Sequence, residues 1–302
     1  MSLSITSTYA GQWSGKYIAA ALLSGDTIAK GGIEVMPNIK YKEVISKMAV
    51  SGIIANSTCD FTDAGDVTLT ERVLQPEEFQ VNTQLCLTPF VSSWEAAELG
   101  FSAYEKMPKK FSDFLIGEVA AQVAQKTEQS IWNGTNANAG EFDGFVTLFS
   151  ADSDVNDVTG TTVTASNVIT EMGKVIDALP SALYGKEDLY LYVSQNVAKA
   201  YVRALAAQGG GYENRVNMWY SMDQPLTFDG VNIFLAQGLN DNQMVLAQKS
   251  NLYFGTGLLN DHNLVKTLDM ADLDGSQNVR IIMRFTSGIQ YGFGNEVVLY
   301  KP

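Results

Sequence analysis

Residues 108–133 read PKKFSDFLIGEVAAQVAQKTEQSIWN, and this stretch decides the fold class. A mostly apolar stripe recurs at every fourth position, at Phe111, Leu115, Val119, Val123, Thr127 and Ile131. This spacing places the stripe on one face of a helix. Pro108 suits the first helical turn, and Gly134 suits the end. The pattern predicts one helix of about 25 residues, roughly 38 Å long. Its stripe must pack against another layer, which we expect to be a sheet that includes C-terminal strands.

Two alternating runs precede this helix, between residues 66 and 88. Their odd-numbered positions carry most of the apolar side chains, as expected for strands with one buried face. The two runs, on either side of Pro76, predict a long β-hairpin formed by pairing one run with the other. A lone hairpin is only marginally stable in water, so we expect a neighbouring copy of the protein to cover it. We therefore expect residues 1–50 and 55–92 to make few contacts with their own subunit. The predicted subunit contacts in the hairpin are Glu71, Arg72, Phe79 and Val81.

The stretch after the long helix mixes helices and strands. A second helix fits residues 166–179, a strand fits 189–193, and a third helix runs to Ala207 before Gly209-Gly210-Gly211. Asp229-Gly230 between two short apolar runs predicts a hairpin of residues 226–228 and 231–235. Further strands are predicted at residues 244–247, 252–255, 279–285, 289–293 and 297–300. The fold class is therefore α+β.

Composition excludes some kinds of partner. The 302 residues carry a formal net charge of −13, with only 20 scattered Lys and Arg residues. A specific reader of nucleic acid would show a basic stripe, so sequence-specific binding is not expected. Copies of such an acidic chain repel one another. Any assembly must therefore rely on shape and buried apolar area, helped by salt.

The sequence contains no recognisable catalytic or metal-binding pattern. His262 is the only histidine and lies in a polar run, while two cysteines, Cys59 and Cys86, are too few for a zinc site. Residues 11–17 resemble a phosphate loop with a spacer one residue short, and residues 152–163 lack the glycine and glutamate of a calcium loop. We expect reduced thiols, with a single Cys59–Cys86 bridge as the alternative, and we expect no cofactor, no metal and no enzyme activity. An enzyme stays a minor alternative.

The N-terminal part is predicted to be an arm. The apolar stretch at residues 17–23 fits a short helix but is far too short to cross a bilayer. It also has no basic leader before it, so we expect no signal peptide and no membrane contact. These features weigh against a further alternative, a secreted β-rich binding protein. We expect residues 1–50 to take their order from what they lie against, rather than from a core of their own.

The order of these elements resembles the major capsid proteins of tailed bacteriophages, which have the Hong Kong 97 type of fold. The similarity covers nearly the whole chain and is carried by several stretches. They are Thr127–Thr135 with Phe142–Phe145 after the long helix, Tyr190–Ser194 before a helix, and Thr227–Ile233 with Leu252–Gly255. Each stretch alone is a weak signal, and their order of occurrence is more specific.

The resemblance implies a division of the chain into parts. It implies an N-terminal arm over residues 1–50, an extended β-hairpin loop over 51–98, a peripheral domain over 99–184 and 263–302, and an axial domain over 185–262. The peripheral domain would contain the spine helix, residues 108–133. Gly209, Gly210 and Gly211 would give flexible subunit contacts near a symmetry axis.

The implied function is a structural shell protein. Pentamers and hexamers of the chain would form an icosahedral shell around double-stranded DNA, which they would contact non-specifically. Scaffolding, portal or cement proteins would be partners, and the protein would be found in the virion and, during assembly, in the host cytoplasm. The alternative with the same fold is an encapsulin-like nanocompartment. Some family members cross-link through a lysine on the extended loop, but residues 48–105 contain no lysine, so a non-covalent shell is expected.

Overall fold

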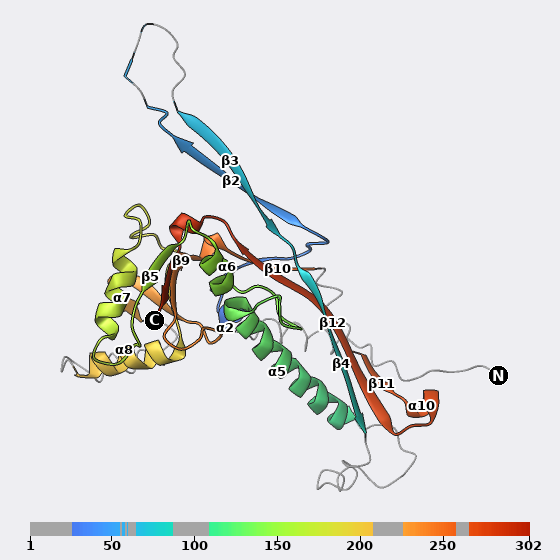
Figure 1. The fold of residues 1–302 in the computed structure, drawn as a ribbon. Coiled ribbons are helices and arrows are strands. Elements are labelled where there is room, and N and C mark those ends of the chain that lie inside the picture. The colour runs from blue at the N-terminus through green and yellow to red at the C-terminus, as the bar shows by residue number, and fades with distance from the viewer. Residues whose placement is uncertain are drawn as a thin grey trace.

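The computed structural model describes residues 26–54, 56–57, 59, 65–86, 109–207, 226–257 and 266–302. It contains two sheets, a long helix and a projecting β-hairpin (Figure 1). The long helix is α5 (Lys109–Asn133), so the prediction of one continuous helix is confirmed. The predicted helix at residues 17–23 and the Gly209–Gly211 run lie outside the described residues, as does His262.

The first sheet has five strands and lies against α5 (Figure 1). Its spatial order is β1 (Glu34–Met36), β10 (Leu252–Thr256), β12 (Asn278–Tyr291) and β11 (Lys266–Asp269), with β4 (Glu77–Cys86) also paired to β12. Because β4 and β11 both pair with residues 279–282 of β12, they lie on its opposite edges. Ile116 and Val123 of α5 cluster with Ile281 and Met283 of β12. The predicted packing of the helix on C-terminal strands is therefore confirmed.

The second sheet has six strands, and helices cover one of its faces. Its order is β5 (Asn156–Thr159), β13 (Val298–Lys301), β9 (Met244–Gln248), β6 (Leu189–Val193), β8 (Val231–Leu235) and β7 (Thr227–Phe228). Two helices, α7 (Val168–Asp177) and α8 (Gln195–Ala207), share one core with Leu191, Leu246 and Tyr300. The sheet takes strands from both stretches predicted as peripheral domain and from the predicted axial domain.

The opposite face of the six-stranded sheet packs on the end of α5. Tyr192, Val245 and Leu299 from this face share a second core with Trp132 of α5 and with α6 (Phe145–Ala151). The remaining short elements are α2 (Asp26–Ala29), α10 (Ala271–Asp274) and two 3-10 turns, Lys249–Asn251 and Gly294–Glu296. One core thus joins the long helix to both sheets.

The first described part of the predicted arm, residues 26–33, belongs to this core, contrary to expectation. Thr27 is fully buried, and its backbone N–H donates to the Glu128 carboxylate at 3.2 Å. Its hydroxyl donates to the same carboxylate and accepts the Trp132 indole N–H at 2.8 Å. Ile28 and Ile33 are also buried. The segment is fixed because its polar groups find buried partners, which the alternation of apolar residues could not reveal.

The predicted pairing of the two runs around Pro76 is wrong. Both runs are strands, β3 (Asp66–Leu74) and β4, but β3 pairs with β2 (Glu43–Ser51) and β4 pairs with β12 over ten residues. A proline holds the preceding residue, Gln75, in extended backbone. The chain therefore runs on from β3 into β4 instead of turning back. Residues 55–92 were expected to make few contacts with their own subunit, and β4 contradicts this expectation because it pairs with β12 of the same chain.

The C-terminal stretch also differs from its prediction. Residues 279–285 and 289–293 were predicted as two strands, but they form one strand of 14 residues. The connection at Thr286–Gly288 stays extended because β10 and β4 pair with it from the two sides. The alternation of buried and exposed side chains is lost around Gly288, because consecutive residues of the strand are buried there. Tertiary pairing therefore overrides the break that the sequence suggests.

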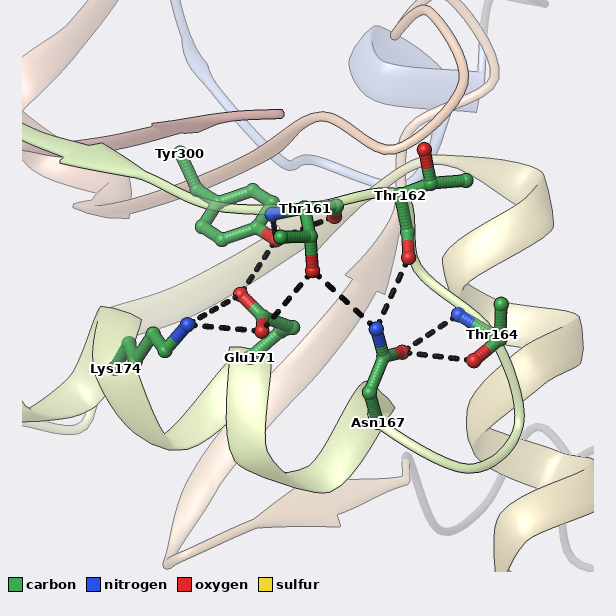
Figure 2. A network of polar contacts seen from close by, with 7 residues as sticks. All are labelled: Thr161, Thr162, Thr164, Asn167, Glu171, Lys174 and Tyr300. Carbon is green, nitrogen blue, oxygen red and sulfur yellow. Dashed lines mark hydrogen bonds and ion pairs between the residues drawn. The ribbon is translucent and has the colours of Figure 1, made fainter.

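A polar network holds β13 against α7 (Figure 2). The Tyr300 hydroxyl donates to Glu171 at 2.7 Å, and the Lys174 ammonium donates to both oxygens of that carboxylate at 2.9 and 3.0 Å. Burial and the hydrogen bond to Glu171 raise the pKa of Tyr300 to about 12. Burial alone would raise the pKa of Glu171, but the hydrogen bonds from Lys174 and Tyr300 outweigh it and lower the pKa. The network fixes the Thr161 loop over the ring.

Packing in this region gives a test of the fold. A Cβ on Gly160 would lie 2.0 Å from the Tyr300 ring, whereas a Cβ on Gly173 of α7 would meet nothing within 4 Å. We expect Gly160→Ala to lower the free energy of unfolding by about 1–3 kcal/mol. The control Gly173→Ala should raise it by about 0.5–1 kcal/mol, because alanine favours helix. Urea unfolding of both variants checks this, and a neutral Gly160→Ala would contradict the packing.

Candidate assembly interface

A two-stranded ribbon formed by β2 and β3 leaves the body of the molecule. The strands pair antiparallel over nine residues, from Glu43 with Leu74 at the root to Ser51 with Asp66 near the tip. At 3.4 Å per residue the ribbon is about 30 Å long. Figure 1 shows it projecting at one end, while β4, β11 and α10 reach the other end. A ribbon of this kind needs support from another surface.

One face of the ribbon is apolar. Cross-strand pairs on this face are Val44 with Val73, Met48 with Leu69, and Val50 with Val67. These six side chains, here called the apolar face, are between 42% and 72% exposed. Ile54, next to the strand end, is 92% exposed. Elsewhere among the described residues, large exposed apolar side chains occur singly, and a contiguous apolar patch marks an interaction site.

The opposite face of the ribbon is fastened to the body at its root by Arg72. The Arg72 Nε–H donates to the Gly292 carbonyl at 2.9 Å, and the guanidinium pairs with the Asp152 carboxylate at 2.5 Å. The guanidinium carbon also lies 4.1 Å from the centre of the Tyr291 ring. We call these contacts the Arg72 anchor. It fixes the direction in which the ribbon leaves the body, because a planar guanidinium binds in one orientation.

The charges of the Arg72 anchor depend on one another. Partial burial would raise the pKa of Asp152, but hydrogen bonds from the Tyr291 hydroxyl, the Asp154 N–H and Arg72 outweigh this effect and lower it to about 2. Burial and the bond to Asp152 raise the pKa of Tyr291. Asp152 therefore stays ionised and Tyr291 stays a donor over the ordinary pH range.

The predicted contact residues of the two strands have different surroundings in the structure. Glu71 is exposed on the same side of the ribbon as the apolar face, between its apolar pairs. Arg72 instead binds its own chain. Phe79 is half-buried, with its ring 6.0 Å from that of Phe142 and 5.5 Å from that of Phe285. Val81 packs against the cluster under α5. Contact of these four residues with a neighbour stays a prediction.

Sequence reasoning missed the β2 half of the apolar face. Residues 43–51 read EVISKMAVS, with Val44, Met48 and Val50 on alternate positions. This alternation was available as a signal, but the stretch was assigned to the arm. The ribbon also contains a lysine that the predicted bounds left out. The Lys47 ammonium lies 4.8 Å from the centre of the Phe293 ring of its own chain.

The described residues show neither a metal cluster nor a membrane helix. In these ranges, no group of three or more His, Cys, Asp and Glu side chains could hold a metal ion. No helix there is long and apolar enough to cross a membrane. Cys59 and Cys86 are both exposed and are not joined in a disulfide.

Comparison with known proteins identifies the fold. No protein-family model matches the chain, and no curated protein sequence matches it. Solved structures do match. The capsid of a native GTA particle aligns with a TM-score of 0.60 at 11% identity, over 93% of this chain and 90% of the other. Mycobacterium phage Cain aligns at 0.58 and 14% identity, over 92% and 90%.

Two further solved structures match the chain. The satellite phage P4 procapsid aligns with a TM-score of 0.55 at 9% identity, over 95% of this chain and 98% of the other. A virus-like particle from Pyrococcus furiosus aligns at 0.55 and 9% identity, over 96% and 98%. The chain therefore has the fold of tailed-phage major capsid proteins, as the order of its elements predicted.

The Arg72 anchor can be tested by pH. Because the pKa of Asp152 in the folded protein lies below its ordinary 3.8, its contribution to stability is complete above about pH 4. It is lost as the pH falls through about 2. We expect Asp152→Asn to lower the free energy of unfolding by about 1.5–3 kcal/mol at pH 7. The difference from the unmodified chain should shrink between pH 4 and 2.

The control for this experiment is Glu71→Gln, one residue away on the opposite side of the ribbon. Its carboxylate has no hydrogen-bond partner in the described part of the chain, so stability at pH 7 should stay unchanged in dilute solution. Urea unfolding at several pH values measures both variants. A difference between Asp152→Asn and the unmodified chain that persists at pH 2 would rule out the ionised Asp152 as the stabilising partner.

Proposed function

We propose that this chain is the shell-building subunit of a tailed-phage capsid, which assembles into an icosahedral shell around double-stranded DNA. The observation that carries this proposal is the apolar face, held out from the body by the Arg72 anchor. A soluble single subunit gains nothing from exposing six large apolar side chains on a fixed ribbon. A subunit of a shell buries them against its neighbour.

The energetics favour assembly through this face. Burying one side chain of this size contributes about 1.5–3 kcal/mol relative to exposure, before the costs of association. The formal charge of −13 on each copy opposes close approach. Apolar contacts keep their strength in salt while the repulsion is screened within about 10 Å at 0.1 M. The acidic composition and the apolar face together suit a subunit that assembles under defined conditions.

The parts of the subunit follow from the same proposal. The ribbon of residues 43–74 acts as the extended loop, and α5 acts as the spine helix, with β4, β11 and β12 in the peripheral domain. The six-stranded sheet with α7 and α8 forms the axial domain and extends the predicted 185–262 to include β5 and β13. Gly209–Gly211 would lie beside the symmetry axis of pentamers and hexamers.

The remaining expectations complete the proposal. The subunit would occur in the virion and, before that, in the host cytoplasm, where scaffolding and portal proteins would direct assembly. A cement protein would reinforce the finished shell, and packaged DNA would be contacted without sequence preference.

A second candidate, an encapsulin-like nanocompartment, is favoured by the match to the Pyrococcus furiosus particle. Electron microscopy of purified particles, with analysis of whether they hold DNA or a cargo enzyme, separates the two.

The role of the apolar face predicts the effect of a charge. Leu69→Asp places a carboxylate in the middle of the face, so we expect it to abolish shell formation while the subunit stays folded. Thr70→Asp is the matched control, because Thr70 is exposed on the opposite side of the ribbon. Light scattering and electron microscopy of concentrated protein measure assembly, and circular dichroism checks the fold. Normal shells from Leu69→Asp would contradict the proposal.

The chemistry of the ribbon predicts a non-covalent shell. The amine of Lys47, at the middle of β2, lies over the Phe293 ring of its own subunit, so it is badly placed to attack an asparagine of a neighbour. Mature particles boiled in detergent with reductant should therefore run as one band near 32.8 kDa. A ladder of dimers, trimers and larger species would show that subunits are covalently joined.

A further inference from the structure

The loop between α5 and α6, residues 134–144, rests on the first residues of β4. The two ends of this α5–α6 loop are tied together, because the Gly134 carbonyl accepts the Gly144 N–H at 2.9 Å. Near its end, Phe142 is buried, and its ring lies 6.0 Å from that of Phe79 in β4. The loop therefore connects the end of the long helix to the place where the chain leaves the ribbon and enters the five-stranded sheet.

One residue of the α5–α6 loop binds two carboxylates. The side-chain amide of Asn136 donates to Glu77 Oε1 at 2.6 Å, and its backbone N–H donates to Asp143 Oδ1 at 2.8 Å. Glu77 is the first residue of β4 and is half-buried, whereas Asp143 belongs to the loop itself. The contact between loop and strand thus gathers two like charges around one asparagine.

The charged groups near this pair do not neutralise it. The third carboxylate of the α5–α6 loop, Glu141, is bound to the Lys126 ammonium of α5. On β12, the residue opposite Glu77 is the uncharged Ser287. Burial raises the pKa of Glu77, and the charge of Asp143 raises it further. Two carboxylates that share a site resist being ionised together, so the pair takes up one proton more readily than a single exposed glutamate.

We propose that the α5–α6 loop is an acid-sensitive latch, in which one proton taken up from solvent by the pair of Glu77 and Asp143 fastens the loop more firmly to β4. The protonated pair carries one negative charge instead of two, and the carbonyl oxygen of Glu77 still accepts the Asn136 amide. The inference goes beyond the proposed function and does not depend on it, because every group of the latch belongs to one subunit.

The direction of the pH effect follows from the raised pKa of Glu77. Its ionised form costs free energy in the folded protein, so the latch gains strength as the pH falls toward the ordinary value of 4.5, and the gain is complete below it. The Arg72 anchor is unaffected in this range, because the pKa of Asp152 is about 2. Burial also raises the pKa of Glu296, near Lys47, so variants are needed to isolate the latch.

A neutral side chain at position 77 tests the latch. Glu77→Gln imitates the protonated form, because it has the same shape and keeps an oxygen for the Asn136 amide. Glu78→Gln is the matched control, since it removes the same charge from the next residue, which is exposed on the opposite side of β4. Hydrogen exchange of residues 134–144 in dilute protein, corrected for the intrinsic effect of pH on exchange, reports how firmly the loop is held.

In the unmodified chain we expect protection of these amides to rise at least about twofold from pH 7 to pH 5. Glu77→Gln should show the higher protection already at pH 7, whereas Glu78→Gln should behave like the unmodified chain. In urea unfolding, Glu77→Gln should have a higher midpoint than the unmodified chain at pH 7 and the same midpoint below about pH 4.

Asp143→Asn separates the pair from the effect of burial alone. It removes one charge and keeps an oxygen for the Asn136 N–H, so the rise in protection between pH 7 and pH 5 should be smaller than in the unmodified chain. An unchanged rise in Asp143→Asn would overturn the pair. Equal protection of the unmodified chain at both pH values, or a Glu77→Gln variant that behaves like Glu78→Gln, would overturn the latch. Failure to form shells would count against the proposed function and leave the latch standing.

Discussion

Backbone pairing along β12 is the constraint on which the rest of the molecule depends. This strand pairs with β4 along one edge and with β10 and β11 along the other. Its buried side supports α5, and its last residue, Tyr291, lies under the Arg72 guanidinium. The direction of the ribbon and the position of the long helix are therefore both set by one continuous strand.

The ribbon combines a fixed root with an unsatisfied surface. At the root, Leu74 is fully buried and the Val73 carbonyl accepts a hydrogen bond from Gln290. Farther out, the side chains of the apolar face are between 42% and 72% exposed in the single subunit. Hydrogen bonding and charge determine where the ribbon points, while apolar area provides the energy of the contact. A substitution in the anchor that changes the direction of the ribbon need not change its apolar area. The direction of the ribbon and the affinity of its contact are therefore separable properties.

Local pattern was sufficient for much of the fold. The four-residue spacing of residues 108–133 predicted α5, and Asp229-Gly230 predicted the β7–β8 turn, which pairs Phe228 with Val231. Pairing partners could not be predicted in the same way, because alternation in β3 and β4 states which side chains share a face and not which strand lies alongside. Glu71 was named from the alternation in residues 66–74, and its contact with a neighbour stays a prediction. Val44, Met48 and Val50 were missed because β2 was taken for part of an arm.

The position of β13 has a consequence for the order of events during synthesis. Its residues, 298–301, lie inside the six-stranded sheet between β5 and β9, so the ribosome makes this interior strand long after its neighbour β5. At roughly 5–20 residues per second, about 10–45 s separate the emergence of the ribbon from that of β13. During this interval the apolar ribbon exists on a nascent chain whose second sheet cannot yet close. Such a chain exposes apolar surface before its body is complete, which is the condition in which aggregation competes with folding.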